Sequence, residues 1–113
     1  MPTWEDVKTL AAGLPEVVES TAWGAPCLRV RKDMFVRLRD NGAALVVRVV
    51  DEEDKEALIK GDPDTFFTTP HYDGYAYVLV RLPNVSEQIL GELIEDAWRL
   101  RAPKRLLAAY DAR

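Results

Sequence analysis

The chain has 113 residues, of which 48% are apolar and 30% are charged, and its formal net charge is −4. This length suits one small domain with a single two-layer core, so we expect a single domain over residues 1–113. The acidic balance excludes a global positive field that would draw the whole molecule to nucleic acid or to an anionic membrane, so any such attraction must be local.

The first predicted element is a helix that begins after Thr3. Thr3 and Asp6 have the spacing of a capping box, and Gly13 followed by Pro15 ends the helical pattern. The apolar residues between these limits recur at helical intervals: Trp4, Val7, Leu10, Ala11 and Leu14. Such a stripe must pack against a second layer.

A run of short strands begins near residues 27–31, where apolar and polar side chains alternate. The turn after it is predicted as a three-residue loop at residues 32–34, which places Arg31 opposite Phe35. A two-residue loop would mix apolar and charged residues on both faces of the sheet. The three-residue loop is therefore the preferred interpretation.

The next turn contains Asn41-Gly42, the dipeptide that best tolerates the positive φ angles of a two-residue hairpin. It pairs Leu38 with Leu45. The resulting meander has one apolar face, made of Leu28, Val30, Val36, Leu38, Leu45, Val47 and Val49. The opposite face carries Arg29, Arg31, Phe35, Arg37, Arg39, Val46 and Arg48.

An acidic helix is predicted over residues 51–61, where acids favour the start and Gly61 favours the stop. After a short strand, residues 75–82 alternate again, with Tyr75, Tyr77, Leu79 and Arg81 on one face. A long helix starts at Asn84, and a short helical segment follows Pro103. This order predicts an α+β two-layer sandwich, α-β-β-β-α-β-β-α, with an antiparallel sheet.

Charge is segregated between these elements. Six arginines fall on predicted strands, on the face away from the apolar one: Arg29, Arg31, Arg37, Arg39, Arg48 and Arg81. The same face carries Phe35, Tyr75 and Tyr77, while the acids concentrate in helices and turns. Arginine binds phosphate bidentately, and exposed aromatic rings stack on bases. The alternative interpretation is an ordinary solvated sheet face filled with long charged side chains.

One loop holds the only histidine. A functional interpretation makes His71 a general base, oriented by Asp73 or by a tyrosine hydroxyl. A structural interpretation makes Pro70 a turn former and Asp73-Gly74 a reversal into the next strand, with His71 and Tyr72 bonding the loop backbone. Turn chemistry accounts for these residue types, and the sequence offers no nucleophile motif or second histidine, so we favour the structural interpretation.

The single cysteine limits redox and metal chemistry. One cysteine cannot form an internal disulfide, and Cys27 with His71 cannot supply the four protein ligands of a structural zinc site, so we expect no metal and no cofactor. Cys27 lies in an alternating strand pattern, where an inert thiol is the favoured interpretation.

No run approaches the ~20 apolar residues of a membrane span. Met1 is not followed by a signal-like pattern, so we expect a cytoplasmic protein with no membrane partner.

Four segments carry a family resemblance: STAWGAPCLRVR (20–31), FFTTPHYDGY (66–75), VLVRL (78–82) and DAWRLRAPKRL (96–106). The chain resembles the MmcQ/YjbR family of small bacterial proteins over nearly its whole length. The resemblance implies the same α+β fold, similar to type III secretion chaperone and CyaY-like folds, and a DNA-binding role for a double-wing surface of sheet and hairpins. It implies no catalytic residues, only motif positions without an assigned role: Trp23, Gly24, Pro26, Pro70, His71, Tyr72, Asp73, Trp98 and Pro103.

These patterns together predict a non-enzymatic domain that binds nucleic acid or a phosphorylated ligand through the arginine face. A protein-interaction module whose sheet binds a partner chain is the alternative. A small-molecule or hydrolytic site around His71 is the third hypothesis.

The three tryptophans have different expected places. Trp4 and Trp98 are expected in the core. Trp23 is expected to pack over the first helix, and a place in a ligand pocket is its alternative. The oligomeric state is left open.

Overall fold

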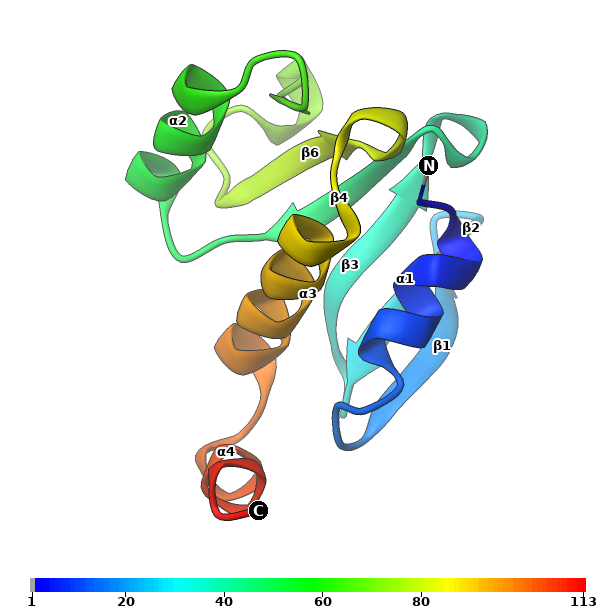
Figure 1. Ribbon diagram of the computed structural model, residues 1–113, viewed down its shortest axis with the longest axis vertical. Helices are drawn as coiled ribbons and strands as arrows, with labels where there is room; N and C mark the ends of the chain where they lie inside the picture. Colours follow the sequence, from blue (N-terminus) through cyan, green and yellow to red (C-terminus); the bar gives the residue numbers. More distant parts are fainter. Residues whose placement is uncertain (1) are drawn as a thin grey trace.

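The computed structural model describes residues 2–113. They form two layers, in which α1 and α3 lie in front of a six-stranded antiparallel sheet (Figure 1). The elements are α1 (Trp4–Ala11), β1 (Val17–Ala22), β2 (Ala25–Val30), β3 (Asp33–Arg39), β4 (Ala44–Arg48), α2 (Glu52–Gly61), β5 (Phe66–Phe67), β6 (Tyr77–Arg81), α3 (Glu87–Arg101) and α4 (Lys104–Asp111). Short 3-10 turns lie at Asp40–Gly42, Pro70–Tyr72 and Leu82–Asn84.

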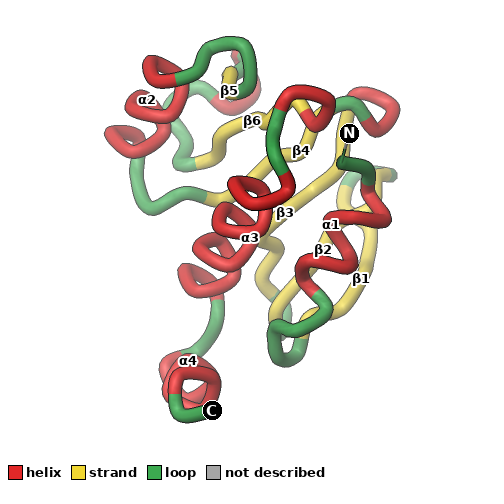
Figure 2. Tube along the Cα trace, in the orientation of Figure 1, coloured by secondary structure: helices red, strands yellow, loops and turns green. Residues whose placement is uncertain are grey.

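The sheet has the strand order β1-β2-β3-β4-β6-β5, so that β1 and the very short β5 form its edges. Figure 2 shows α4 at one end of the molecule and α2 near the other. This arrangement confirms the predicted α+β fold with an antiparallel sheet. Among residues 2–113, no helix combines the length and the apolar character that a bilayer crossing requires.

The main core fills the space between the sheet and the helices. The predicted apolar face is confirmed, with Leu28, Val30, Val36, Leu45, Val47 and Val49 buried and Leu38 packed against them. Trp98 of α3 is fully buried, and its indole N–H donates to the Pro15 carbonyl at 3.0 Å. Trp4 is half-buried at the margin of this core, where its N–H donates to Glu19 at 3.1 Å.

The predicted helix starts are confirmed at α1, α2 and α4 and corrected at α3. Thr3 and Asp6 form the reciprocal capping box, with the Thr3 N–H donating to Asp6 Oδ2 at 2.8 Å. The α3 helix begins after Ser86, whose Oγ accepts a backbone N–H of the first turn. Asn84 cannot cap this helix because its amide is directed to the Asp64 carbonyl, 2.6 Å away.

The strand β1 was not expected from the sequence. It pairs with β2 along its whole length, from Val17 opposite Val30 to Ala22 opposite Ala25. As an edge strand it has only exposed and half-buried residues, so its sequence lacks the continuous apolar alternation that marks an inner strand. The sheet therefore has four strands before α2, not three.

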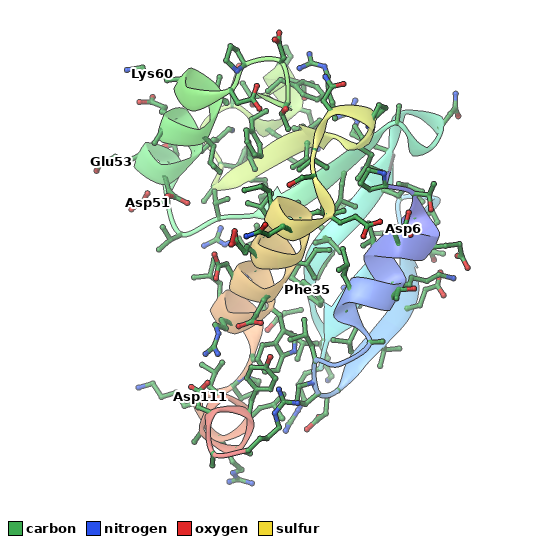
Figure 3. All side chains as sticks on the ribbon, viewed as in Figure 1. Asp6, Phe35, Asp51, Glu53, Lys60 and Asp111 are labelled. Carbon is green, nitrogen blue, oxygen red and sulfur yellow. The ribbon has the colours of Figure 1, made fainter. Side chains whose placement is uncertain are left out.

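The predicted three-residue loop between β2 and β3 is wrong. Val30 pairs with Asp33 across a two-residue turn, and the register shifts at a bulge between Leu28 and Arg29. The bulge places an extra residue, Phe35, in β3, and extra residues break the alternation of faces. Phe35 is fully buried in the main core beneath the helices (Figure 3), not among the arginines as expected.

The turn between β3 and β4 confirms the prediction. Leu38 pairs with Leu45, and Asn41 and Gly42 have φ angles of 54° and 92°. Because β3 pairs with β4 in the predicted register, Arg37 and Arg39 lie on the sheet face turned away from α1 and α3. We call this face the open face.

Candidate binding groove on the open sheet face

The open face is partly covered by the loop between β5 and β6. Val46 and Leu79 project from the sheet and are fully buried against Tyr72 of this loop. Phe67 and Tyr77 pack at the margin of the same cluster. Val46 therefore lies in a small second core, so the open face is not a uniformly solvated surface of charged side chains.

The turn chemistry predicted for this loop is confirmed. The Tyr75 N–H donates to the Tyr72 carbonyl at 3.1 Å, and Asp73 (φ −61°, ψ 133°) and Gly74 (φ 83°) have the angles of a type II turn. The Asp73 carboxylate accepts a hydrogen bond from the Thr68 hydroxyl at 3.3 Å. Its interactions are those of a loop that reverses the chain.

His71 differs from the expectation. It is exposed, and its ring packs edge-on against Tyr72 with the ring centroids 4.7 Å apart. Among residues 2–113 its imidazole has no hydrogen-bond partner, so neither Asp73 nor a tyrosine hydroxyl orients it as a general base requires. In the described part of the chain this side chain also makes no hydrogen bond to the loop backbone, contrary to the structural interpretation.

A buried lysine holds the loop in place. Lys55 of α2 is only 4% exposed, and its ammonium donates to the carbonyls of Tyr72 at 2.7 Å and Tyr75 at 3.1 Å. Hydrogen bonds from a charged donor are about twice as strong as neutral ones. Lys55 was not predicted, although its helical spacing from the half-buried Leu58 and Ile59 places it on the inner side of α2.

Three turns enclose a groove of about 780 Å³ on the open face. They are the β1–β2 turn, the β3–β4 turn and the 3-10 turn that carries His71. The groove is lined by Trp23, Gly24, Ala25, Pro26, Arg37, Leu38, Arg39, Asn41, Gly42, His71 and Tyr72. Most of the motif positions of the first and second family segments thus meet at one place, although the sequence separates them widely.

The expectation that Trp23 packs over the first helix is wrong. Trp23 lies at the tip of the β1–β2 hairpin, with φ 50°, and is 81% exposed. The hairpin closes through the pair of Ala22 and Ala25, so Trp23 and Gly24 form its two-residue turn, and both line the groove. The guanidinium of Arg37 lies 5.5 Å from the centroid of the indole ring.

Four of the predicted arginines lie over aromatic rings of the open face. The pairs are Arg37 with Trp23 at 5.5 Å, Arg39 with Tyr72 at 5.9 Å, Arg48 with Tyr77 at 5.6 Å and Arg81 with Phe67 at 4.1 Å, each from Cζ to the ring centroid. Such contacts contribute about 0.5–1 kcal/mol each at exposed sites. The rings therefore position the guanidiniums and at the same time are partly occupied by them.

The remaining candidate residues lie apart from the groove. Arg29 donates to the Lys32 carbonyl at 3.1 Å, and Arg31 forms an ion pair with Glu16 at 2.6 Å. Tyr75 is 62% exposed just before β6. The sequence places these side chains near the arginine face, but only Arg37 and Arg39 among the arginines line the groove.

A second residue that sequence reasoning missed is Arg101, the last residue of α3. Its Nη2 donates to the Tyr77 hydroxyl at 2.7 Å. The signal was present in the helical spacing, because Arg101 follows the fully buried Ala97 and Trp98 by one turn. A cation at that position is therefore directed toward the sheet.

The comparisons with known proteins agree with this arrangement. The YjbR family model matches residues 12–100. Uncharacterized proteins of Mycobacterium tuberculosis and Mycobacterium bovis are each 39% identical over an alignment 124 positions long, which spans 97% of this chain and 96% of theirs. The crystal structure of Deinococcus radiodurans protein DR2400, a domain of family DUF419, superimposes with a TM-score of 0.80 at 21% identity, over 98% of this chain and 89% of that one. With the resemblance of the sequence motifs confirmed in this way, the chain belongs to the YjbR family.

Proposed function

We propose that the protein is a non-enzymatic domain that binds single-stranded nucleic acid. One base stacks on Trp23 in the groove, and Arg37 and Arg39 attract the neighbouring phosphates. The observation that carries the proposal is the conformation of Trp23, which combines 81% exposure with a φ angle of 50°.

The stability of the fold does not explain a tryptophan at position 23. Two-residue hairpin turns prefer Asn, Asp or Gly, which reach positive φ at low cost. Other residues there cost about 1–2 kcal/mol. An exposed indole at such a position therefore strains the backbone without filling the core, and backbone strain of this kind is concentrated at functional sites.

The surroundings of Trp23 fit a nucleotide. A base that stacks on an aromatic side chain gains about 1–3 kcal/mol, and stacking requires a base that is not already paired. Arg37 is held near the ring by its own hydrogen bond, since its Nε donates to the Ala22 carbonyl at 2.9 Å. Because that cation is fixed before any ligand arrives, little conformational entropy is lost on binding phosphate.

The environment of His71 supports a binding role over hydrolysis. A general base needs a partner that fixes its tautomer and orientation, and the expected partner, Asp73, accepts a hydrogen bond from Thr68 instead. His71 is better placed to line the groove beside Tyr72.

A fluorescence titration with a short oligothymidylate tests the proposal. Binding should quench the emission of Trp23, the most exposed of the three tryptophans, and Trp23→Ala should weaken binding roughly 5- to 100-fold, which is the loss of one base stack. Arg37→Gln should reduce the salt dependence by about one phosphate contact, and Arg105→Gln on α4 is the matched control. No affinity at ~50 mM salt, where non-specific electrostatic binding is strong, would reject the proposal.

A second candidate function is a protein-interaction module, which the edge strand β1 favours. Within residues 2–113 no strand pairs with its outer side, and its Val18 is 57% exposed. An exposed edge can accept a strand from a partner. Val18→Lys should block such pairing. A partner that is retained from nuclease-treated lysate by the wild type and by Trp23→Ala, and is lost with Val18→Lys, would favour this second function.

A further inference from the structure

A second group of cations lies at the opposite end of β4 from the groove. Arg48 and Tyr77 are cross-strand neighbours of β4 and β6, and the Arg48 guanidinium lies 5.6 Å from the centroid of the Tyr77 ring. Arg101 reaches the same residue from the end of α3, and its Nη2 donates to the Tyr77 hydroxyl at 2.7 Å. Three elements thus bring two guanidiniums to one phenol, and we call this group the Arg48–Tyr77–Arg101 cluster.

The N–H groups of the cluster are used differently from those of five other arginines. Arg29, Arg37 and Arg81 donate to backbone carbonyls, and Arg31 and Arg99 form ion pairs with acids. Within residues 2–113, in contrast, Arg48 makes no hydrogen bond, and Arg101 makes only the one to Tyr77. The Nε atoms of both are buried without an acceptor.

In the part of the chain that the structure describes, no carboxylate forms an ion pair with Arg48 or Arg101. Asp54 and Asp96 line a hollow that Arg48 also lines, but neither comes within 4.0 Å of its guanidinium in the described part of the chain. Two guanidiniums held against one tyrosine side chain repel each other, and the repulsion is stronger where water is partly excluded. An anion placed between them removes this repulsion and supplies the missing acceptors.

The donors that remain select the shape and charge of that anion. The Tyr77 hydroxyl accepts from Arg101, so its own proton is available to a ligand. Two guanidinium forks and one O–H make a site with several donors and two positive charges, which suits a tetrahedral oxyanion with two negative charges. We propose that the Arg48–Tyr77–Arg101 cluster binds the phosphate dianion of a phosphomonoester.

This site goes beyond the proposed stacking groove. The groove and the cluster adjoin through the rings of Tyr72 and Tyr77, whose centroids lie 6.0 Å apart. Tyr72 belongs to the groove lining and Tyr77 to the cluster. A small phosphorylated molecule can therefore occupy the cluster alone, and the terminal phosphate of a nucleic acid can occupy it by the same chemistry.

Nuclear magnetic resonance of the arginine side chains tests the site directly. Glycerol 3-phosphate is the probe, because it carries a phosphomonoester and no ring that could stack on Trp23. In the wild type, its addition should shift the Nε–H signals of Arg48 and Arg101 beyond the shift caused by sodium chloride at equal ionic strength. Dimethyl phosphate, which has a single negative charge, should bind more weakly. An absence of any excess shift would overturn the proposal without the need for a variant.

Matched variants separate the site from general charge effects. Arg48→Gln and Arg101→Gln should each weaken the affinity for glycerol 3-phosphate about tenfold or more, the loss of one charged hydrogen-bonding group. Tyr77→Phe should weaken it several-fold. Arg105→Gln removes the same charge from an exposed position of α4 and should change the affinity less than twofold. An equal loss with Arg105→Gln would overturn the proposal, because it would show only long-range attraction.

A 5′-phosphorylated oligothymidylate distinguishes the two sources of the phosphate. If it binds more tightly than the unphosphorylated form, and Arg101→Gln removes the difference, the site reads a nucleic acid end. If glycerol 3-phosphate binds and the 5′-phosphate has no effect, the ligand is a small phosphomonoester. A chain that binds glycerol 3-phosphate and neither oligonucleotide would reject the stacking function and leave this site intact.

Discussion

Adjacent residues of β4 show how differently the two faces of the sheet are built. Leu45 and Val47 belong to the large cluster under the helices, whereas Val46 packs on Tyr72 of a loop and Arg48 lies over Tyr77. The covered face is stabilised by burial of apolar area, which has no directional requirement. The open face depends on guanidinium and ammonium donors that must meet particular carbonyls and rings. A change on the covered face should therefore alter stability alone, while changes on the open face should separate stability from binding.

The largest expected effect belongs to Phe35, which the sequence pattern assigned to the open face and the structure places under the helices. Phe35→Ala should destabilise the fold by about 3–5 kcal/mol, the usual cost of removing a fully buried phenylalanine. Chemical denaturation measures this loss. Tyr75→Ala is the control, since this ring is 62% exposed and its removal should cost less than about 0.5 kcal/mol. Similar losses for the two variants would mean that the bulge in β3 does not bury Phe35.

A smaller effect is expected for Lys55, which couples α2 to the loop of the open face. Lys55→Met keeps most of the side-chain volume but leaves the carbonyls of Tyr72 and Tyr75 without their donor. Each unpaired buried group costs about 1–3 kcal/mol. We expect a lower midpoint of denaturation and faster amide exchange in residues 70–75. Lys60→Met, on the solvent side of α2 (Figure 3), should change neither quantity.

Prediction from sequence succeeded for the covered face and failed for Phe35 and Lys55. The covered face could be predicted because strand alternation and helix periodicity both follow from burial of one side of an element. Phe35 was misplaced because a bulge changes the register by one residue. No particular residue type marks the position of such a bulge in the sequence. Lys55 was missed because a buried lysine depends on carbonyls that only the tertiary fold brings to it.

The candidate site was predictable in part for the same reason. Arg37 and Arg39 were placed on the correct face, since the Asn41-Gly42 turn fixes their register. Trp23 was assigned to the wrong place, because tryptophan is rare in the turn of a hairpin and the edge strand before it was not recognised. The groove itself arises from three turns, and the distance between turns cannot be obtained from local patterns.

Replacement of Trp23 should separate stability from binding on the open face. Trp23→Asn should stabilise the fold by up to about 1 kcal/mol, because asparagine tolerates the left-handed conformation at φ 50° better than tryptophan does. The same change should abolish the stacking of a base. Thermal unfolding and the oligothymidylate titration measure the two effects on the same samples. Lys32→Asn, in the next hairpin turn along the chain, at the other end of β2, is the control and should leave both unchanged. A destabilised Trp23→Asn would show that the indole contributes to the fold.

The smallest effect concerns the solvent side of α3, which is acidic while the open face is basic. Burial raises the pKa of Asp96 above its usual range, Glu95 adds to this shift, and Arg99 opposes it. The folded state therefore favours the protonated form of Asp96. The stability gained in this way is fully present below the unfolded-state pKa, and it is lost as the pH rises through the folded-state pKa. At neutral pH the ionised carboxylate destabilises the fold. Asp96→Asn should then stabilise the protein by no more than about 0.5 kcal/mol at pH 7, because the side chain is largely exposed.

The pH dependence of this gain decides its cause. Below the ordinary aspartate pKa of about 4 the wild-type side chain is also neutral, so the advantage of Asp96→Asn should disappear there. Denaturant titrations at pH 7 and at pH 3 make the comparison, and Glu56→Gln on α2 controls for the change in net charge. If the gain at pH 3 equals that at pH 7, the substitution acts through helix propensity or packing. If it vanishes at pH 3, the charge segregation between the helix layer and the open face has a measurable cost in stability, which is expected where surface charge is arranged for binding.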